Sequence, residues 1–391
     1  MLQEALEKKG LEKFIPILEK ISHMTFALGL LIELTIVIVE KSEYIILYEG
    51  LWFRLTFVLF GISLLTAKHR LRDWIWLFLF GIIGVISYRA TGRNEIIRWI
   101  AFIWACQGKD MKKVFQVTFW YTLAGCGIIF LLSVFGIYGS ILQEAVYRTE
   151  EAWTPGMTET RYCFGMGHPN AFHCMILVVT WLGVYCYYEK MKWYSYILLF
   201  VGHVVVYFFT DSKTGLLTAG ITLVVTIFTK IIKNRKWTCF VGITILLLMV
   251  GISVYMAYIS KDIIYHPILK KIDGLLSNRV LNLYYNTANH EGILETWSLW
   301  SSENCTAYFD LGIVRMFYWF GILPTIVYFI CQIRLIWCSY KNRDLILIGI
   351  LICITIYSVF EAHFISDYMG RNYILFWFGM YLSDMLGEEK R

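Results

Sequence analysis

The amino-acid sequence predicts an all-α, polytopic membrane protein with about twelve transmembrane helices. Of the 391 residues, 58% are hydrophobic and 16% are charged, and the mean hydropathy is +0.60. The apolar residues form blocks of about 17–25 residues, the length that crosses a roughly 30 Å hydrocarbon core as a helix. The alternating pattern of a β-barrel is absent, so helices remain as the way to satisfy the backbone in lipid.

The apolar blocks leave no room for a soluble domain between them. Residues 1–391 are therefore expected to form a single integral membrane domain. The spans are expected near 21–40, 49–67, 73–89, 94–107, 114–137, 169–188, 193–210, 213–231, 238–258, 311–333, 344–362 and 371–386. The fourth span is short and carries Arg98, a costly residue at membrane depth.

Basic residues orient the predicted bundle, because loops rich in Lys and Arg stay in the cytoplasm. Every second loop is basic, as expected for twelve spans with both termini inside. The basic set consists of Lys8, Lys9, Lys13, Lys20, Lys68, Arg70, Arg72, Lys109, Lys112, Lys113, Lys190, Lys192, Lys230, Lys233, Arg235, Lys236, Arg334, Lys341, Arg343, Lys390 and Arg391. The long loops 138–168 and 259–310 then face away from the cytoplasm. The net charge of +6 is spread over short loops and forms no nucleic-acid patch.

The segment 161–170 places polar groups at the outer mouth of a span. Pro169 suits the first turn of a helix, which puts His168 near the N-cap and Asn170 at the mouth. An outward-facing helix N-terminus favours phosphate, and Arg161 can add bidentate contacts to the same oxyanion. Taken alone, the segment fits a capped helix start with a snorkelling arginine equally well.

A second polar cluster, 210–215, forms the outer turn between two predicted spans. Asp211 or Ser212 is a good N-cap for the following helix. Lys213 is one of the few basic residues expected on the outer face of the membrane. An ordinary capped hairpin explains this cluster about as well as a binding site does.

The remaining polar groups belong to the second long loop and the last one. Arg279, His290 and Asp310 lie in the loop 259–310. Arg315 lies just inside the next predicted span, and Arg371 opens the last span from the outer side. Because the clusters 161–170, 211–215, 279–315 and 361–372 all fall at outer ends of spans, they predict a shared cationic cavity suited to a polyanionic lipid head group such as a pyrophosphate.

The chain resembles the Wzy-type O-antigen, capsular and exopolysaccharide polymerases, in the variant typical of Gram-positive bacteria. The likeness is carried by Gly-x-Gly-His-Pro-Asn within 161–170, by Thr-Asp-Ser-Lys-Thr-Gly at 210–215, which is similar to the family's Ser-Arg-Thr-Gly hairpin, and by the cytoplasmic turn 108–113. Lys213 departs from that pattern, because it stands where arginine is usual and cannot make a bidentate contact.

The resemblance implies a metal-independent membrane glycosyltransferase without a cofactor, in the cytoplasmic (inner) membrane of a bacterium, with a GT-C-like fold and an active site facing outside. Its substrates would be oligosaccharides linked to undecaprenyl pyrophosphate, and its partners a chain-length regulator and a flippase. Positive charge from Arg161, Arg279, Lys213 and Arg371 would stabilise the leaving pyrophosphate. His168, Asp310, His290 and Asp211 are candidates for the base, with His168 and Asp310 favoured, and Asn170, Ser212 and Arg315 complete the expected binding set.

Three other functions remain open at this point. A ligase similar to O-antigen ligases would use the same lipid donor but transfer the finished glycan to another acceptor. A lipid-linked oligosaccharide transporter would need ionisable residues near the midplane, whereas the polar clusters here lie on one face. A structural or receptor role would predict that Arg161, Lys213 and Arg279 tolerate alanine.

Overall fold

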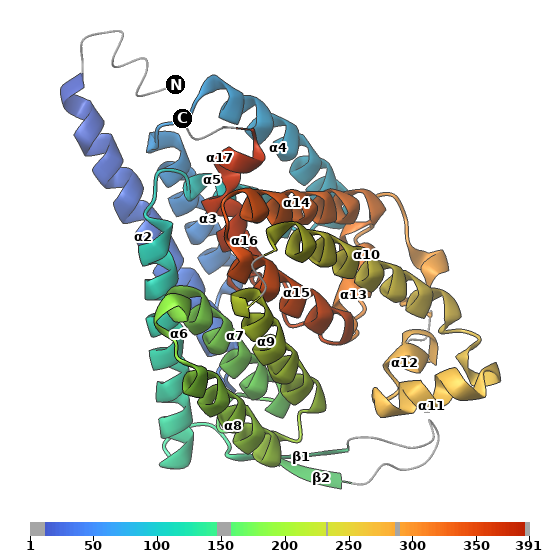
Figure 1. Cartoon of the computed structure of the whole chain (residues 1–391). Coiled ribbons are helices and arrows are strands. Elements are labelled where there is room, and N and C mark those ends of the chain that lie inside the picture. The colour runs from blue at the N-terminus through green and yellow to red at the C-terminus, as the bar shows by residue number, and fades with distance from the viewer. Residues whose placement is uncertain (1–11, 147–157, 232–233, 286–289, 388–391) are drawn as a thin grey trace.

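The computed structural model describes residues 12–146, 158–231, 234–285 and 290–387, and helices dominate it (Figure 1). The described residues contain one small sheet, in which β1 (Leu142–Val146) pairs antiparallel with β2 (Thr158–Tyr162). The all-α class expected from the sequence is therefore confirmed, with this hairpin as an addition. The hairpin belongs to the predicted loop 138–168, of which residues 147–157 lie outside the described residues.

Most of the helices follow one another through short connections, and the two longest join α6 to α7 and α12 to α13. In chain order they are α2 (Ile15–Glu40), α3 (Glu49–Thr66), α4 (Leu71–Thr91), α5 (Glu95–Ala105), α6 (Met111–Val134), α7 (Pro169–Tyr187), α8 (Trp193–Thr210), α9 (Lys213–Ile231), α10 (Arg235–Ile259), α11 (Pro267–Leu275), α12 (Arg279–Tyr285), α13 (Gly312–Phe320), α14 (Ile322–Lys341), α15 (Leu345–Phe360), α16 (Ile374–Met380) and α17 (Leu382–Met385). Short 3-10 helices η1 to η5 occupy Glu12–Phe14, Tyr188–Lys190, Ile263–Tyr265, Leu294–Thr296 and Met369–Arg371.

Nine helices within the described ranges are long and apolar enough to cross a membrane, so the protein is a multi-pass membrane protein. They are α2, α3, α4, α6, α7 with η2, α8, α9, α10 and α14. The other predicted spans, 94–107, 344–362 and 371–386, coincide with shorter helices: α5 with 11 residues, α15 with 16, and the pair α16 and α17.

The predicted span 311–333 contains two helices, because the chain breaks at Gly321. Gly321 has φ +94°, and a Cβ there would lie 2.7 Å from the Ser301 nitrogen and 2.8 Å from the Leu299 oxygen. Because the segment before α13 approaches so closely, its carbonyls accept hydrogen bonds from the first N–H groups of α14. Ile322 N donates to the Ser298 carbonyl at 2.9 Å, and Leu323 N donates to the Leu299 carbonyl at 3.1 Å. Irregular backbone inside a membrane protein needs this kind of internal partner.

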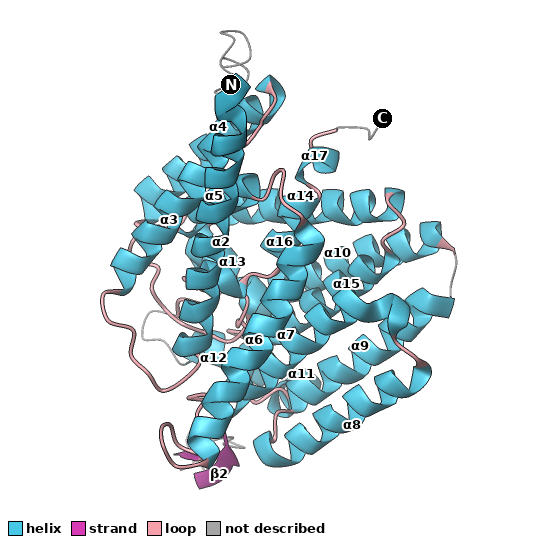
Figure 2. Ribbon diagram, turned by 90° about the vertical axis from the view of Figure 1, so that its left-hand side faces the viewer, coloured by secondary structure: helices cyan, strands magenta, loops and turns pink. Residues whose placement is uncertain are grey.

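The interior of the bundle is formed by its later helices. All nine residues of α13 are buried, and α15 is buried along most of its length. α15 packs between α9 and α10, while α2 packs along α3. Figure 2 shows α8, α9 and α10 lying at a steep angle to α2. In Figure 1 the start of α2 and α17 lie at the top, and β1, β2 and α11 at the bottom.

The described bundle has one end where α2 begins and α17 lies, and another where β1 and β2 lie (Figure 1). At one end Arg72 donates to the Gly387 carbonyl at 3.4 Å, and Lys109 to the Ser22 hydroxyl. At the other end α2 finishes and α7 and α9 begin; we call this the cavity end. The assignment of the cavity end to the outer face of the membrane remains a prediction.

A buried ion pair explains how Arg98 is accommodated in α5. Its guanidinium lies 3.1 Å from Glu33 of α2, and both side chains are almost fully buried. Thr56 of α3 donates to the same Glu33 oxygen at 2.6 Å, and Arg98 also donates to the Asp367 carbonyl at 2.8 Å. The pair therefore connects three helices to the last loop before α16.

Removing one member of this pair should be strongly destabilising. Glu33→Ala leaves the Arg98 guanidinium buried without its counter-charge, which typically costs about 3–5 kcal/mol. We expect a clear fall in the unfolding temperature of the purified protein in detergent. The double variant Glu33→Leu/Arg98→Leu should recover most of the loss, because it leaves no charge uncompensated. A double variant less stable than the single one would contradict this account.

Candidate functional site

A polar cavity of about 770 Å³ opens at the cavity end. Its lining comes from the end of α2, from β2, from the starts of α7 and α9, from the turn between α11 and α12, and from the segments around α13 and after α15. It contains nine of the eleven residues that the sequence proposed for the site: Arg161, His168, Asn170, Asp211, Lys213, Arg279, Asp310, Arg315 and Arg371.

The two other proposed residues lie elsewhere. Ser212 is buried beneath the turn between α8 and α9 and does not line the cavity. The ring of His290 stacks on Tyr284 with the centroids 3.8 Å apart, and its Nδ1 lies 2.6 Å from the Tyr284 carbonyl. The structure therefore does not bring His290 together with the other candidate bases.

His168 is the N-cap of α7, as the sequence suggested. Its backbone is extended, with φ −154°, and its Nδ1 accepts the Asn170 N–H at 3.1 Å. Burial, with a smaller effect of the nearby Arg161 charge, lowers the pKa of His168 to about 4. A neutral ring whose Nδ1 accepts carries its hydrogen on Nε2. At neutral pH the ring is thus arranged to donate a hydrogen bond through Nε2.

Arg161 connects three elements around the mouth of α7. Its Nε donates to the carbonyl of Thr210 at the end of α8 at 2.6 Å, and one terminal nitrogen donates to Asn170 Oδ1 at 3.3 Å. These contacts position the guanidinium at the mouth of α7. Arg161 and His168 both line the cavity.

The turn between α8 and α9 brings a cation to the cavity. Asp211 adopts a left-handed conformation, with φ +47°, which lets α9 begin two residues after α8 ends. Lys213 opens α9 and lines the cavity, and the Thr214 hydroxyl donates to Glu361 Oε1 at 2.7 Å. Gly215 packs directly on the His173 ring, where a Cβ would lie 2.5 Å from Cγ. This close approach holds the start of α9 against α7.

Arg279 is bound between two carboxylates. Glu361 Oε1 lies 2.7 Å from a terminal nitrogen, and Asp310 Oδ2 lies 3.6 Å from Nε. Glu361 is buried, whereas the side chain of Asp310 is 51% exposed. Burial raises the pKa of Glu361, an effect that the adjacent Arg279 opposes. Glu361 therefore anchors the guanidinium, and Asp310 is the more exposed of these two cavity carboxylates.

Three further groups that line the cavity were absent from the proposed set. Lys41, directly after α2, contacts His363 Nδ1 through its ammonium at 3.1 Å, and His363 Nε2 lies 3.7 Å from Glu361 Oε2. Glu361 and His363 belong to the polar cluster 361–372, which the sequence places at the outer end of a span. Lys41 carried a weaker signal: it is a basic residue at the outer end of the first predicted span.

The other two arginines of the cavity are held differently. Arg371 pairs with Glu40 at the end of α2, and its guanidinium lies over the Tyr368 ring, 4.5 Å from the centroid. Arg315 bonds to backbone carbonyls, at 2.7 Å and 3.0 Å to Phe309 and at 3.0 Å to Ile365. Because carbonyl oxygens carry no net charge, these contacts do not neutralise the positive charge that Arg315 brings to the cavity.

The charge of the cavity is more balanced than the sequence suggested. Its cations are Lys41, Arg161, Lys213, Arg279, Arg315 and Arg371, and its carboxylates are Glu40, Asp211, Asp310, Glu361 and Asp367. Six positive and five negative side chains give a formal charge of +1 with the histidines neutral. The cavity is therefore nearly neutral. Two of its cations, Arg279 and Arg371, are paired with the carboxylates Glu361 and Glu40.

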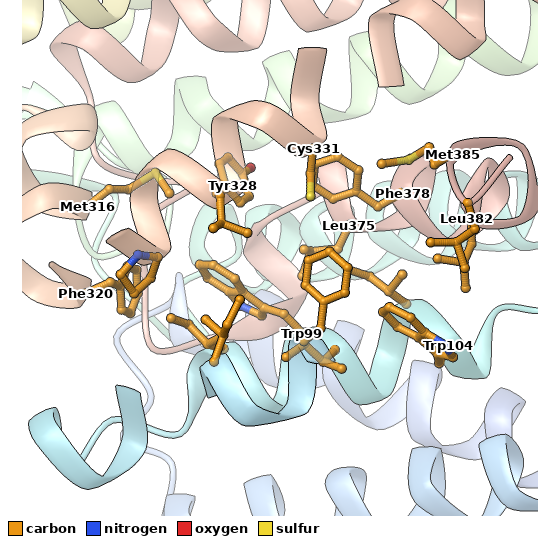
Figure 3. A pocket seen from close by; sticks show the side chains of 18 residues that line it. Trp99, Trp104, Met316, Phe320, Tyr328, Cys331, Leu375, Phe378, Leu382 and Met385 are labelled. Carbon is orange, nitrogen blue, oxygen red and sulfur yellow. The ribbon is translucent and has the colours of Figure 1, made fainter. Parts of the chain in front are cut away.

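A second, apolar pocket of about 100 Å³ lies away from this site. Figure 3 shows Trp99 and Trp104 of α5 facing side chains such as Tyr328 and Phe378 of α14 and α16. No charged residue lines the pocket, and it shares no lining residue with the cavity. Its polar side-chain groups are those of Trp99, Trp104, Tyr328 and Cys331.

The cap role of His168 predicts a pH effect on stability. Because its pKa falls from 6.5 to about 4 on folding, the unfolded chain binds more protons between these values. Stability supplied by neutral His168 is complete above pH 6.5 and should be lost as pH falls towards 4. Since one pKa unit corresponds to about 1.4 kcal/mol, the loss could reach about 3 kcal/mol.

The measurement compares the unfolding temperatures of wild type and His168→Asn between pH 7 and pH 4. Asparagine can cap a helix but does not titrate, so the wild type should lose stability relative to the variant as pH falls. His266→Asn, which changes an exposed histidine before α11, is the matched control. Parallel profiles of wild type and His168→Asn would contradict the assignment.

The chain matches no family model, no curated protein and no solved structure. The function of the cavity must therefore be inferred from its own geometry. Its features are a volume suited to a small organic ligand, several positioned cations, and the half-exposed carboxylates of Asp310 and Asp367 beside them.

Proposed function

We propose that the protein is a polysaccharide polymerase that joins oligosaccharide repeat units carried on undecaprenyl pyrophosphate at the outer face of a bacterial cytoplasmic membrane. The observation that supports this proposal is the convergence of nine sequence-proposed polar residues, from separate parts of the chain, on one cavity at one end of a membrane bundle. A donor with an anionic pyrophosphate and a sugar needs such a mixture of fixed cations and polar groups.

The cations would act on the leaving group. When the bond between the anomeric carbon and the pyrophosphate oxygen breaks, the electron pair leaves with the pyrophosphate, so negative charge grows there. Contacts with the Thr210 carbonyl and Asn170 fix the Arg161 guanidinium, and contacts with the Phe309 and Ile365 carbonyls fix that of Arg315. Donors fixed before the reaction stabilise developing charge without having to reorganise.

Asp310 is the best-placed base for the acceptor. Its carboxylate is half exposed, lines the cavity, and lies 3.6 Å from Arg279. In the proposed step an acceptor hydroxyl gives its proton to Asp310 while its oxygen bonds to the anomeric carbon of the donor. His168 suits this role less well, because its Nδ1 is engaged in the cap of α7.

Arg279 would position Asp310 for that step. Glu361 fixes one side of the guanidinium, and the Thr214 hydroxyl donates to Glu361 in turn. The position of Asp310, which would receive the proton, thus depends on contacts that run through Arg279 and Glu361 to Thr214 at the start of α9. A rigid second layer of this kind is what keeps a reacting group within a fraction of an ångström of its productive position.

Asp310→Asn should abolish most of the polymerising activity without unfolding the protein. Loss of a general base typically lowers turnover about 10²–10⁴-fold, and the substitution keeps the size of the side chain. The assay incubates purified protein with a lipid-linked repeat unit and reads product length on a gel. We expect kcat to fall while KM for the donor changes little.

Asp262→Asn serves as the control, because Asp262 is an exposed carboxylate of the same long loop and does not line the cavity. Products of normal length from Asp310→Asn at the wild-type protein level would overturn the assignment of the base. Transfer of preformed long glycan to a different acceptor, without lengthening by wild type, would instead identify a ligase.

A further inference from the structure

An open apolar groove adjoins the polar cavity. It has a volume of about 550 Å³ and runs between α8 and α9. The residues that line it are Phe200 and Tyr207 of α8 and Lys213, Leu216, Leu217, Gly220, Ile221 and Val224 of α9. Both helices are apolar enough to span a membrane, and Leu217 and Val224 are exposed on the surface of the bundle.

The groove and the cavity meet at two residues. Lys213 and Leu217 line both of them. Lys213 is the only charged residue of the groove and stands at its end, where α9 begins. A lysine can lay its methylene stem along apolar surface while its ammonium reaches a polar region. The apolar groove and the polar cavity therefore meet within about one turn of α9, between Lys213 and Leu217.

The lining of the groove follows the helical repeat of α9. Positions 213, 216, 217, 220, 221 and 224 fall on one stripe of a helix. Eleven residues at 1.5 Å each give this stripe a length of about 16 Å, roughly half of the hydrocarbon core of a bilayer. Gly220 lies midway along the stripe, and the absence of a side chain there leaves room between α8 and α9.

We propose that the groove between α8 and α9 binds the polyprenyl chain of the lipid-linked donor, with Lys213 at the boundary between chain and pyrophosphate. This inference rests on the proposed function and adds the binding site for the hydrocarbon part of the substrate. The ligand that fits is amphipathic: anionic where it meets Arg161 and Lys213, and apolar along α9. The open side of the groove lets the rest of a long chain continue into the surrounding lipid.

The apolar pocket of Figure 3 is the competing site for the chain. It is much smaller, about 100 Å³ against about 550 Å³, and shares no residue with the cavity. A chain bound there would have no short path to the cations around α7 and α9. The groove is favoured because it shares two lining residues with the cavity.

Filling the groove should weaken binding of long-chain donors only. Gly220→Leu places a side chain beside Phe200, whose ring would lie 3.6 Å from the new Cβ, and leucine favours a helix more than glycine does. We expect KM for the undecaprenyl donor to rise about tenfold, the equivalent of losing the burial of two methylene groups. A donor with the same glycan pyrophosphate on a two-isoprene chain should be used as well as by wild type.

Gly202→Leu is the matched control. It adds the same side chain to α8 at an exposed position where a Cβ meets nothing within 4 Å, and Gly202 does not line the groove. This variant should use both donors as wild type does. Equal effects of Gly220→Leu on the long and short donors, or no effect on either, would overturn the proposal.

A binding measurement separates this proposal from the proposed function. Undecaprenyl pyrophosphate with a photoreactive group in its first isoprene units is cross-linked to the protein in nanodiscs, and labelled peptides are identified by mass spectrometry. Labels on α8 and α9 that Gly220→Leu reduces support the groove, even if wild type forms no polymer. Labels on α5, α14 or α16 would overturn it, even if wild type polymerises normally.

Discussion

The contact between Glu361 and Arg279 is the interaction on which most of the cavity depends. Glu361 follows α15, Arg279 begins α12, and Thr214 from the start of α9 donates to the same carboxylate oxygen. His363 extends the contacts to Lys41 after α2. Four parts of the chain are thus fixed by one buried carboxylate. Burying a charge is costly unless it is paired and hydrogen-bonded, so each of these partners is needed by the others.

The near balance of charge follows from the same constraint. Six cations gathered in a buried cavity would repel one another strongly in a medium of low dielectric constant. The chain supplies Glu361 for Arg279 and Glu40 for Arg371, and leaves Arg315 to backbone carbonyls. Ion pairs therefore fix Arg279 and Arg371, while Arg315 is held by carbonyl oxygens that carry no net charge.

The sequence predicted the class of the fold and the convergence of nine polar residues on one cavity for different reasons. Apolar blocks of the length of a membrane span identified nine helices, because length and hydropathy are local properties. The convergence of Arg161, Lys213 and Arg279 followed from the alternation of loops, which places every second loop at the same end. The break at Gly321 was missed, because it depends on the Ser298 and Leu299 carbonyls, which reach it from a separate segment of the chain. Lys41 and its contact with His363 were missed for the same reason, since a pair 322 positions apart has no local pattern.

The short helices α5 and α13 have a consequence for how the chain is assembled. Each carries one arginine, Arg98 or Arg315, and with 11 and 9 residues neither is long enough to cross the hydrocarbon core alone. An arginine on such a segment is unfavourable in lipid until its partners are present. Each arginine has one partner earlier in the chain, Glu33 for Arg98 and the Phe309 carbonyl for Arg315. Each also donates to a carbonyl of the segment after α15, that of Asp367 or Ile365, which is synthesised later, so neither arginine is fully bonded until that segment is in place.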